Sequence, residues 1–166
     1  MSERVLRVAL RIPRPREEVF AFFAAAQNLQ AITPPELNFR IMSPLPIALR
    51  QGSLIDYGLR LYGIALRWRT RISTWEPPSC FVDEQLVGPY TQWTHRHTFA
   101  DTPDGGTLVE DEVRYRMPFG VLGRLAHLLV RPQLDRIFRY RTARVHELLT
   151  VSSQVPDFTG ELTISH

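Results

Sequence analysis

Two histidines and two large aromatic residues occupy every second position of one segment. Of all the patterns in the sequence, the type and spacing of these histidines are best suited to chemistry. On an extended strand every second side chain points to the same side, so Trp93, His95, His97 and Phe99 share a face. The aromatic residues predict that this face is buried. A buried imidazole needs a partner, because a polar group that loses water without gaining a hydrogen bond costs free energy.

Carboxylates on neighbouring segments are the candidate partners. Asp111 alternates with apolar residues such as Val113, and if Phe81 faces inward then Asp83 and Gln85 face inward as well. Consecutive strands that are joined by short turns pair in antiparallel fashion. We therefore expect these polar side chains to converge on the two histidines across one sheet.

Three roles fit such a cluster. Paired imidazoles and carboxylates can form a satisfied network that only orders the core. The same groups can orient a hydroxyl or carbonyl of a ligand in a mostly apolar pocket. They can also move protons, with His95 or His97 as general acid–base and Asp83 or Asp111 orienting the ring. The residues alone leave all three roles open.

We expect no metal and no cofactor. His95 and His97 are two residues apart on a strand, roughly 7 Å, and a zinc or iron site needs three or four convergent ligands. The sequence supplies only these two with certainty. Gly105-Gly106 is typical of a turn, and no dinucleotide, Walker or Ser-His-Asp pattern is present.

The elements that must position these residues follow from hydrophobic periodicity. A strand over residues 4–12 precedes short helices over residues 15–26 and 28–32. Six further strands are expected over residues 37–41, 55–61, 64–72, 81–87, 91–100 and 107–117. A long helix with an apolar stripe follows to residue 149, and Pro132 should kink or split it near Val130, with Phe119 to Leu129 acting as a lid.

This order predicts an α+β fold: a seven-stranded antiparallel sheet, two short helices and a long C-terminal helix that covers the apolar face of the sheet. Arg67, Arg69 and Arg71 should lie on the exposed, convex face. Residues 1–150 should form one ligand-binding domain. Residues 151–166 lack periodicity and are expected to be a flexible tail.

Composition excludes several classes of protein. The chain has 166 residues and a formal charge of +3, and each of its 20 basic residues is an arginine, scattered rather than clustered. We therefore expect no nucleic-acid partner. No stretch approaches the ~18 apolar residues of a membrane span, so we expect no stable membrane insertion and a cytoplasmic location. Cys80, the single cysteine, is expected to be a packing residue, and the protein to be a monomer or weak homodimer.

Several segments together carry a family resemblance. They are residues 12–20 (IPRPREEVF), 28–35 (NLQAITPP), 75–78 (WEPP), 81–85 (FVDEQ), 88–90 (GPY), 93–99 (WTHRHTF) and 138–141 (FRYR). The chain resembles the START-like superfamily of helix-grip proteins (START/Bet v 1-like), specifically the bacterial polyketide cyclase/dehydrase and lipid-transport group. The resemblance covers about residues 4–149. It implies an internal cavity, in a superfamily that includes aromatase/cyclases, lipid and quinone carriers, hormone receptors and oxygenase domains.

We therefore expect the protein to bind a small, largely apolar molecule (a lipid, quinone or polyketide-like metabolite) between the sheet and the long helix. The expected ligand-binding residues are Tyr57, Trp68, Asp83, Gln85, Trp93, His95, His97, Asp111 and Tyr115. The main alternative is a polyketide-type cyclase, aromatase or dehydratase whose catalytic candidates are His95, His97 and Asp111. A third hypothesis is an accessory module that docks through the arginine-rich outer face of the sheet.

Overall fold

The structure, a computed structural model, describes residues 3–118 and 120–150, and of residues 120–127 only the backbone. The strands are β1 (Arg4–Ile12), β2 (Arg40–Ile41), β3 (Leu54–Leu61), β4 (Ile64–Glu76), β5 (Cys80–Val87), β6 (Gln92–Asp101) and β7 (Thr107–Arg116). The helices are α1 (Arg16–Ala24), α2 (Asn28–Ala31), the 3-10 turn η1 (Pro35–Leu37) and α3 (Gly120–Thr150).

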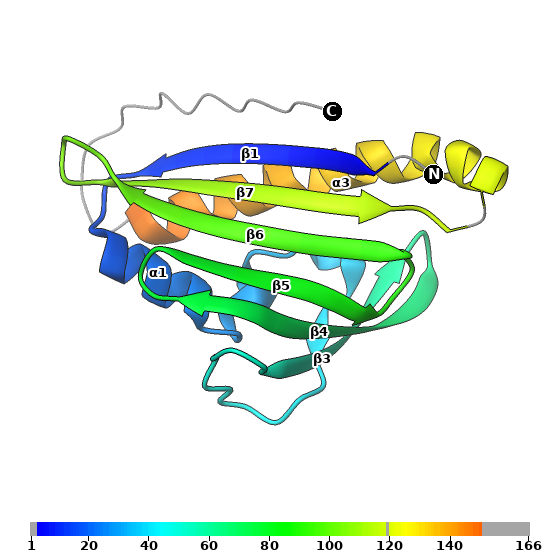
Figure 1. Cartoon of the computed structure of the whole chain (residues 1–166), viewed down its shortest axis with the longest axis horizontal. Coiled ribbons are helices and arrows are strands. Elements are labelled where there is room, and N and C mark those ends of the chain that lie inside the picture. The colour runs from blue at the N-terminus through cyan, green and yellow to red at the C-terminus, as the bar shows by residue number, and fades with distance from the viewer. Residues whose placement is uncertain (1–2, 119, 151–166) are drawn as a thin grey trace.

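The strands form one seven-stranded antiparallel sheet in the order β1-β7-β6-β5-β4-β3-β2. From β2 to β7 each strand pairs with its neighbour in sequence, as expected for a meander with short turns. β1 joins the far edge beside β7, where Leu6 lies opposite Val113. Helix α3 lies behind the sheet, and α1 lies at one end of it (Figure 1). The predicted α+β architecture is confirmed.

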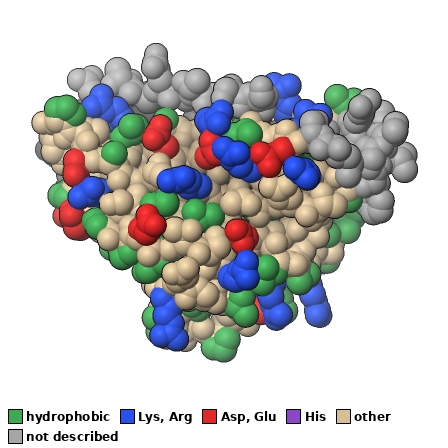
Figure 2. Space-filling model, viewed as in Figure 1, with side chains coloured by type: hydrophobic (Ala, Val, Ile, Leu, Met, Phe, Trp, Pro, Cys, Tyr) green, Lys and Arg blue, Asp and Glu red, His purple; other side chains and the backbone are tan. Residues whose placement is uncertain are grey.

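The face of β4 that turns inward is the predicted one. Trp68 and Thr70 are buried, whereas Arg67, Arg69 and Arg71 are exposed. The outer face mixes arginines with acidic side chains (Figure 2). Neighbouring strands pair these charges: Arg69 Nε lies 2.7 Å from a carboxylate oxygen of Asp56 on β3. Paired charges of this kind make the outer face less suited to docking an acidic partner than a row of free arginines would be.

The core has two contiguous parts. The first packs Phe20 and Phe23 of α1 against Phe81 and Phe99 of the sheet. The second joins Trp68, Tyr90, Val113 and Tyr115 to Leu134 and Phe138 of α3. Trp68, Phe81, Phe99 and Val113 are buried as predicted. Trp93 is only half-buried, which corrects the prediction for that residue.

Two predicted elements differ from the observed ones. The strand expected over residues 37–41 is mostly absent, because η1 occupies Pro35–Leu37 and Asn38 has a left-handed backbone with φ of 46°. Only Arg40–Ile41 pairs with β3. The predicted break in the long helix is also wrong. α3 is continuous through Pro132, since the buried side chains of Leu134 and Phe138 hold the following turns against the sheet.

Two predictions concern residues that the structure does not describe. The side chains of residues 119–127, which make up most of the expected lid, lie outside the described set, as does the expected tail over residues 151–166. Among the described helices, none is both long and apolar enough to cross a lipid bilayer.

Candidate functional site

A cavity of about 190 Å³ lies between the sheet and α3. Most of its wall is apolar, with side chains such as Phe23, Ile72, Trp68 and Phe138. The polar residues of the wall are Asn28, Thr33, Tyr57, Tyr62, Thr70, Asp83, Tyr90, His95, His97, Gln133 and Arg141. A mostly apolar cavity with a few polar groups is the usual character of a small-molecule site.

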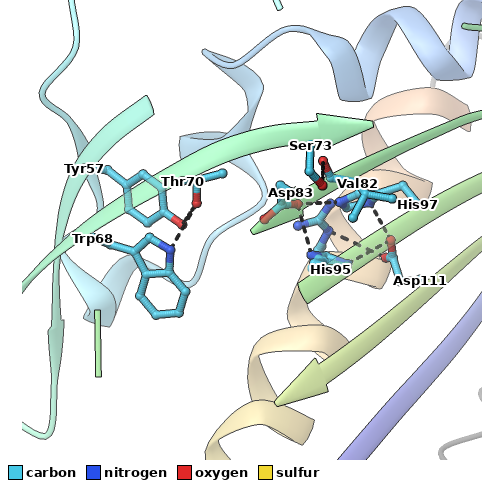
Figure 3. A network of polar contacts seen from close by, with 10 residues as sticks. Tyr57, Trp68, Thr70, Ser73, Val82, Asp83, His95, His97 and Asp111 are labelled. Carbon is cyan, nitrogen blue, oxygen red and sulfur yellow. Dashed lines mark hydrogen bonds and ion pairs between the residues drawn. The ribbon is translucent and has the colours of Figure 1, made fainter. Parts of the chain in front are cut away.

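Two histidines and two aspartates form a closed ring of contacts on the inner face of β5, β6 and β7 (Figure 3). Asp83 lies across the sheet from His95, and Asp111 lies across from His97. The hydrogen bonds follow the diagonals. His97 Nε2 lies 3.0 Å from Asp83 Oδ2, and His95 Nε2 lies 3.2 Å from Asp111 Oδ1.

Two further contacts close the ring without forming hydrogen bonds. His95 Nδ1 lies 3.6 Å from Asp83 Oδ2. His97 Nδ1 lies only 2.7 Å from Asp111 Oδ1, yet its angle leaves this nitrogen without a hydrogen-bond partner. Both imidazoles therefore turn one nitrogen toward Asp83 and the other toward Asp111.

Burial and charge set the protonation of the ring. Burial lowers the pKa of His95, and the neighbouring His97 lowers it further. Burial also opposes the charged form of His97, but the negative charges and hydrogen bonds of Asp111 and Asp83 outweigh it and raise the pKa of His97. Burial alone would raise the pKa of Asp111, whereas His97 and Arg141 hold it well below its usual range. The two pKa shifts therefore favour His97 over His95 as the site of a proton.

Arg141 brings a third charge to the ring from α3. Its Nε lies 3.9 Å from Asp111 Oδ2, and the guanidinium carbon lies 5.4 Å from the centre of the Phe23 ring. Arg141 also lines the cavity, and its buried Nε has no hydrogen-bond partner. Because Nε faces Asp111 and is shut off from solvent, the part of Arg141 that lines the cavity is the rest of its side chain.

Aromatic rings fix the orientation of the two imidazoles. The Phe81 ring stacks on His97, with centroids 4.1 Å apart and an angle of 21° between the planes. Phe138 of α3 meets His95 edge-on at 5.5 Å. His95 and His97 are 5% and 2% exposed. The ring is thus held in place by packing as well as by its own polar contacts.

A second polar group lies in another part of the cavity wall (Figure 3). Trp68 Nε1 donates a hydrogen bond of 3.1 Å to Thr70 Oγ1, and the Tyr57 hydroxyl lies 3.3 Å from the same oxygen. The Tyr57 and Trp68 rings stack with centroids 5.9 Å apart. Burial raises the pKa of the Tyr57 phenol, so it stays protonated.

Six of the nine expected ligand-binding residues line the cavity: Tyr57, Trp68, Asp83, Trp93, His95 and His97. Three do not. Asp111 lies behind the two imidazoles. Tyr115 packs behind Tyr90, with ring centroids 5.7 Å apart. Gln85 instead bridges a turn, where its amide donates to the Tyr90 carbonyl at 2.7 Å and accepts from the Tyr90 N–H.

Arg141 and Tyr62 are among the residues of the cavity wall that the sequence analysis did not predict. Arg141 lies on the apolar stripe of α3, seven residues after Leu134 and four before Val145, both of which are buried. A charged residue on an apolar helix face indicates a polar site inside the fold, so the sequence pattern could have revealed Arg141. Tyr62 gave no such signal. It is at the tip of the β3–β4 hairpin, 64% exposed, and its hydroxyl donates a 2.8 Å hydrogen bond to the Leu129 carbonyl of α3.

Comparison with solved structures identifies the fold. The Zhui aromatase/cyclase from Streptomyces sp. R1128 is similar, with a TM-score of 0.73 and 13% identity over 89% of this chain and 94% of that one. A START superfamily protein from Mycobacterium smegmatis has a TM-score of 0.63 and 14% identity, over 87% and 98% of the two chains. The chain has the START-like helix-grip fold.

A plant protein shares this helix-grip fold. Ginseng major latex-like protein 151 from Panax ginseng has a TM-score of 0.60 and 13% identity, over 89% of this chain and 98% of that one. No protein-family model matches the sequence, and no curated protein is significantly similar to it. At these identities the similarity concerns the helix-grip fold, and the chemistry of the site must be argued from its own residues.

Proposed function

We propose that this helix-grip protein binds a small, largely apolar molecule, of the lipid, quinone or polyketide-like kind, in the cavity between the sheet and α3. The observation that carries the proposal is the composition of the wall: aromatic and aliphatic side chains surround one cluster of acidic and basic groups, formed by Asp83, His95, His97 and Arg141. Such a wall favours a ligand with an apolar body and one polar end.

The polar end of the ligand belongs at the histidine–aspartate ring. There the guanidinium of Arg141, which lines the cavity, offers a donor, and Asp83 offers an acceptor. A hydroxyl or carbonyl placed there would satisfy groups that are otherwise buried at a cost in free energy. The apolar remainder would lie toward Tyr57 and Trp68.

Binding can be tested with 6-propionyl-2-(dimethylamino)naphthalene, an uncharged two-ring probe whose fluorescence rises and shifts to the blue in apolar surroundings. We expect saturable binding by the wild-type chain. Ile137→Trp should abolish it, because Ile137 lines the cavity and a larger side chain there fills the space. Arg139→Trp places the same side chain on an exposed position of the same helix and should bind normally. Equal binding by both variants would show that the probe is elsewhere.

A polyketide-type cyclase, aromatase or dehydratase is the second candidate function. The specific observation in its favour is that two imidazoles, each contacted by two carboxylates, lie side by side on the cavity wall. The fold of the Zhui aromatase/cyclase is also similar. The cavity would hold a flexible poly-β-ketone near its reactive conformation.

Loss of turnover with retention of binding would separate the two functions. With a poly-β-keto thioester as substrate, His95→Ala should abolish cyclised product while the two-ring naphthalene probe still binds. A wild-type chain that binds the probe yet forms no product above the uncatalysed rate would leave ligand binding as the function. Native mass spectrometry of the purified chain can then identify a co-purifying molecule.

A further inference from the structure

We propose that Asp83, His95 and His97 form a binding site for one divalent transition-metal ion of the zinc and iron(II) type. This inference goes beyond ligand binding and does not depend on it. It also revises the expectation of no metal, which rested on there being only two certain ligands. The fold supplies the third, because Asp83 on β5 lies directly across from His95 on β6.

The three donor atoms already have the spacing of a metal site. One ligand atom from each of the three residues lies within 4.8 Å of the other two. Asp83 Oδ2 is 3.0 Å from His97 Nε2 and 3.6 Å from His95 Nδ1. Ligands bonded to one tetrahedral zinc ion at about 2.0 Å are separated from each other by about 3.3 Å. The two distances from Asp83 Oδ2 lie on either side of this separation, so the carboxylate already stands where an ion shared with both imidazoles would need it.

Asp111 occupies the position of an outer carboxylate that orients the ligands. Histidines bound to a metal commonly donate their other N–H to a carboxylate, which fixes the ring and its tautomer. Here His95 Nε2 and His97 Nδ1, the nitrogens turned away from Asp83, lie 3.2 and 2.7 Å from Asp111 Oδ1. A small rotation of His97 would align the second contact. One carboxylate would then hold both imidazoles.

The site would keep an open position toward the cavity. Asp83, His95 and His97 all line the cavity, whereas Asp111 does not. An ion held by three protein ligands on this wall has its remaining position free for water or for an oxygen of a bound molecule. Two histidines and one carboxylate with an open position are the donor set of catalytic zinc and non-haem iron sites.

The local charges can accept a divalent ion. With both imidazoles neutral, Asp83 and Asp111 contribute two negative charges and Arg141 one positive charge. Arg141 is on the Asp111 side, with Nε 3.9 Å from Asp111 Oδ2, so its charge is partly offset there. A divalent ion would leave one net positive charge, which hydroxide or an anionic group at the open position would neutralise.

The test uses the full chain, stripped with a chelator, and the metal ion alone. In calorimetry we expect one Zn²⁺ per chain with a dissociation constant of about 1 μM or lower. Bound Co²⁺ should show the intense visible bands of a four- or five-coordinate ion. Absence of one-to-one binding in this range would overturn the proposal and leave the ring as a hydrogen-bonded network that shares a proton.

Variants locate the ion. Asp83→Asn and His97→Ala should abolish one-to-one binding, and Asp111→Asn should weaken it about 10- to 100-fold. The matched controls Asp101→Asn, on the exposed end of β6, and His146→Ala, on α3, should bind as wild type does. Unchanged affinity in Asp83→Asn would overturn the proposal.

A measurement on the wild-type chain tests the proposal even if the variants fail to fold. Nitrogen NMR of the imidazoles should show that Zn²⁺ shifts His95 Nδ1 and His97 Nε2, while the partner nitrogens keep their protons. Zinc that shifts only His146, or no imidazole of the ring, would also overturn the proposal.

Discussion

Thr70 shows how one hydroxyl orders a wall of the cavity. It is 3% exposed, and its oxygen accepts a hydrogen bond from Trp68 Nε1 while lying 3.3 Å from the Tyr57 hydroxyl. Thr70→Val keeps the shape of the side chain but leaves the indole N–H without its acceptor. We expect the free energy of unfolding, measured by urea denaturation, to fall by about 1–3 kcal/mol.

The control for Thr70→Val is the same substitution on the other face of the sheet. Thr94 precedes His95 on β6, and its side chain points outward. Thr94→Val should change the free energy of unfolding by less than about 0.5 kcal/mol. Equal losses from both variants would mean that the Thr70 hydroxyl has no special role.

Residues of the ring could be predicted because alternation along strands is enough to assign a face. His95, His97, Asp83 and Asp111 each lie two residues from an apolar residue on the same face, and adjacent strands bring the four together. Alternation does not reveal what happens at a strand end. Gln85 has the parity of Asp83 but lies beside the β5–β6 turn.

Gly88 explains where the Gln85 side chain goes. A Cβ atom at Gly88 would lie 2.3 Å from Gln85 Oε1, so only glycine leaves room for Gln85 to reach the Tyr90 backbone. Local contacts within a turn, such as these, leave no trace in the hydrophobic periodicity of the sequence. The sequence therefore predicted the face of Gln85 correctly and its role incorrectly.

At the scale of elements, Pro132 is the clearest departure from local rules. An interior proline lacks the N–H that would bond the Leu128 carbonyl, yet α3 continues through it. Both residues are exposed, so water can reach this turn. Pro132→Ala restores the donor and removes the ring, and we expect it to raise the free energy of unfolding by about 1–3 kcal/mol.

Urea denaturation measures the effect of Pro132→Ala directly. Gln133→Ala, at the next position of α3, serves as a control that leaves the backbone hydrogen bonds unchanged. A lower stability of Pro132→Ala than of wild type would contradict the prediction and would show that the turn is shaped to fit proline.

The elements themselves were predictable to different degrees. Strands with strict alternation, such as β4 and β7, were placed correctly because each has one buried and one exposed face. The segment around Asn38 was not, since a left-handed residue ends the alternation without any signal in hydrophobicity. The register shifts between β4 and β5, at Arg69/Thr70 and Ile72/Thr74, were equally invisible.

At the scale of the whole molecule, a hydroxyl at the tip of the β3–β4 hairpin bonds to α3. The turn at its tip, Tyr62-Gly63, has positive φ angles of 49° and 80°, a conformation that suits asparagine or glycine better than tyrosine. Tyr62 is also part of the cavity wall, and its hydroxyl donates to the Leu129 carbonyl of α3 at 2.8 Å. We infer that this contact holds the hairpin and the helix together at the rim.

Because the cavity is small, the Tyr62–Leu129 contact would favour the binding of small ligands over large ones. An engineered cavity of about 150 Å³ in another protein holds benzene, so the 190 Å³ here suits a ligand of one or two rings. A ligand of three or four rings would require the hairpin to move away from α3, which breaks the Tyr62–Leu129 hydrogen bond. The free energy of that bond would then oppose binding of large ligands only.

Tyr62→Phe removes the hydroxyl and keeps the ring and the backbone, so it tests this preference for small ligands. Because a neutral hydrogen bond contributes about 0.5–1.5 kcal/mol, the variant should bind three- and four-ring aromatic ketones about 2- to 12-fold more tightly than wild type. One- and two-ring ketones should bind equally to both chains. Quenching of the fluorescence of Trp68 and Trp93 in the cavity wall gives the dissociation constants. If affinity changes by the same factor for every size, the Tyr62 hydroxyl contacts the ligand or the fold in general, and the rim does not select by size.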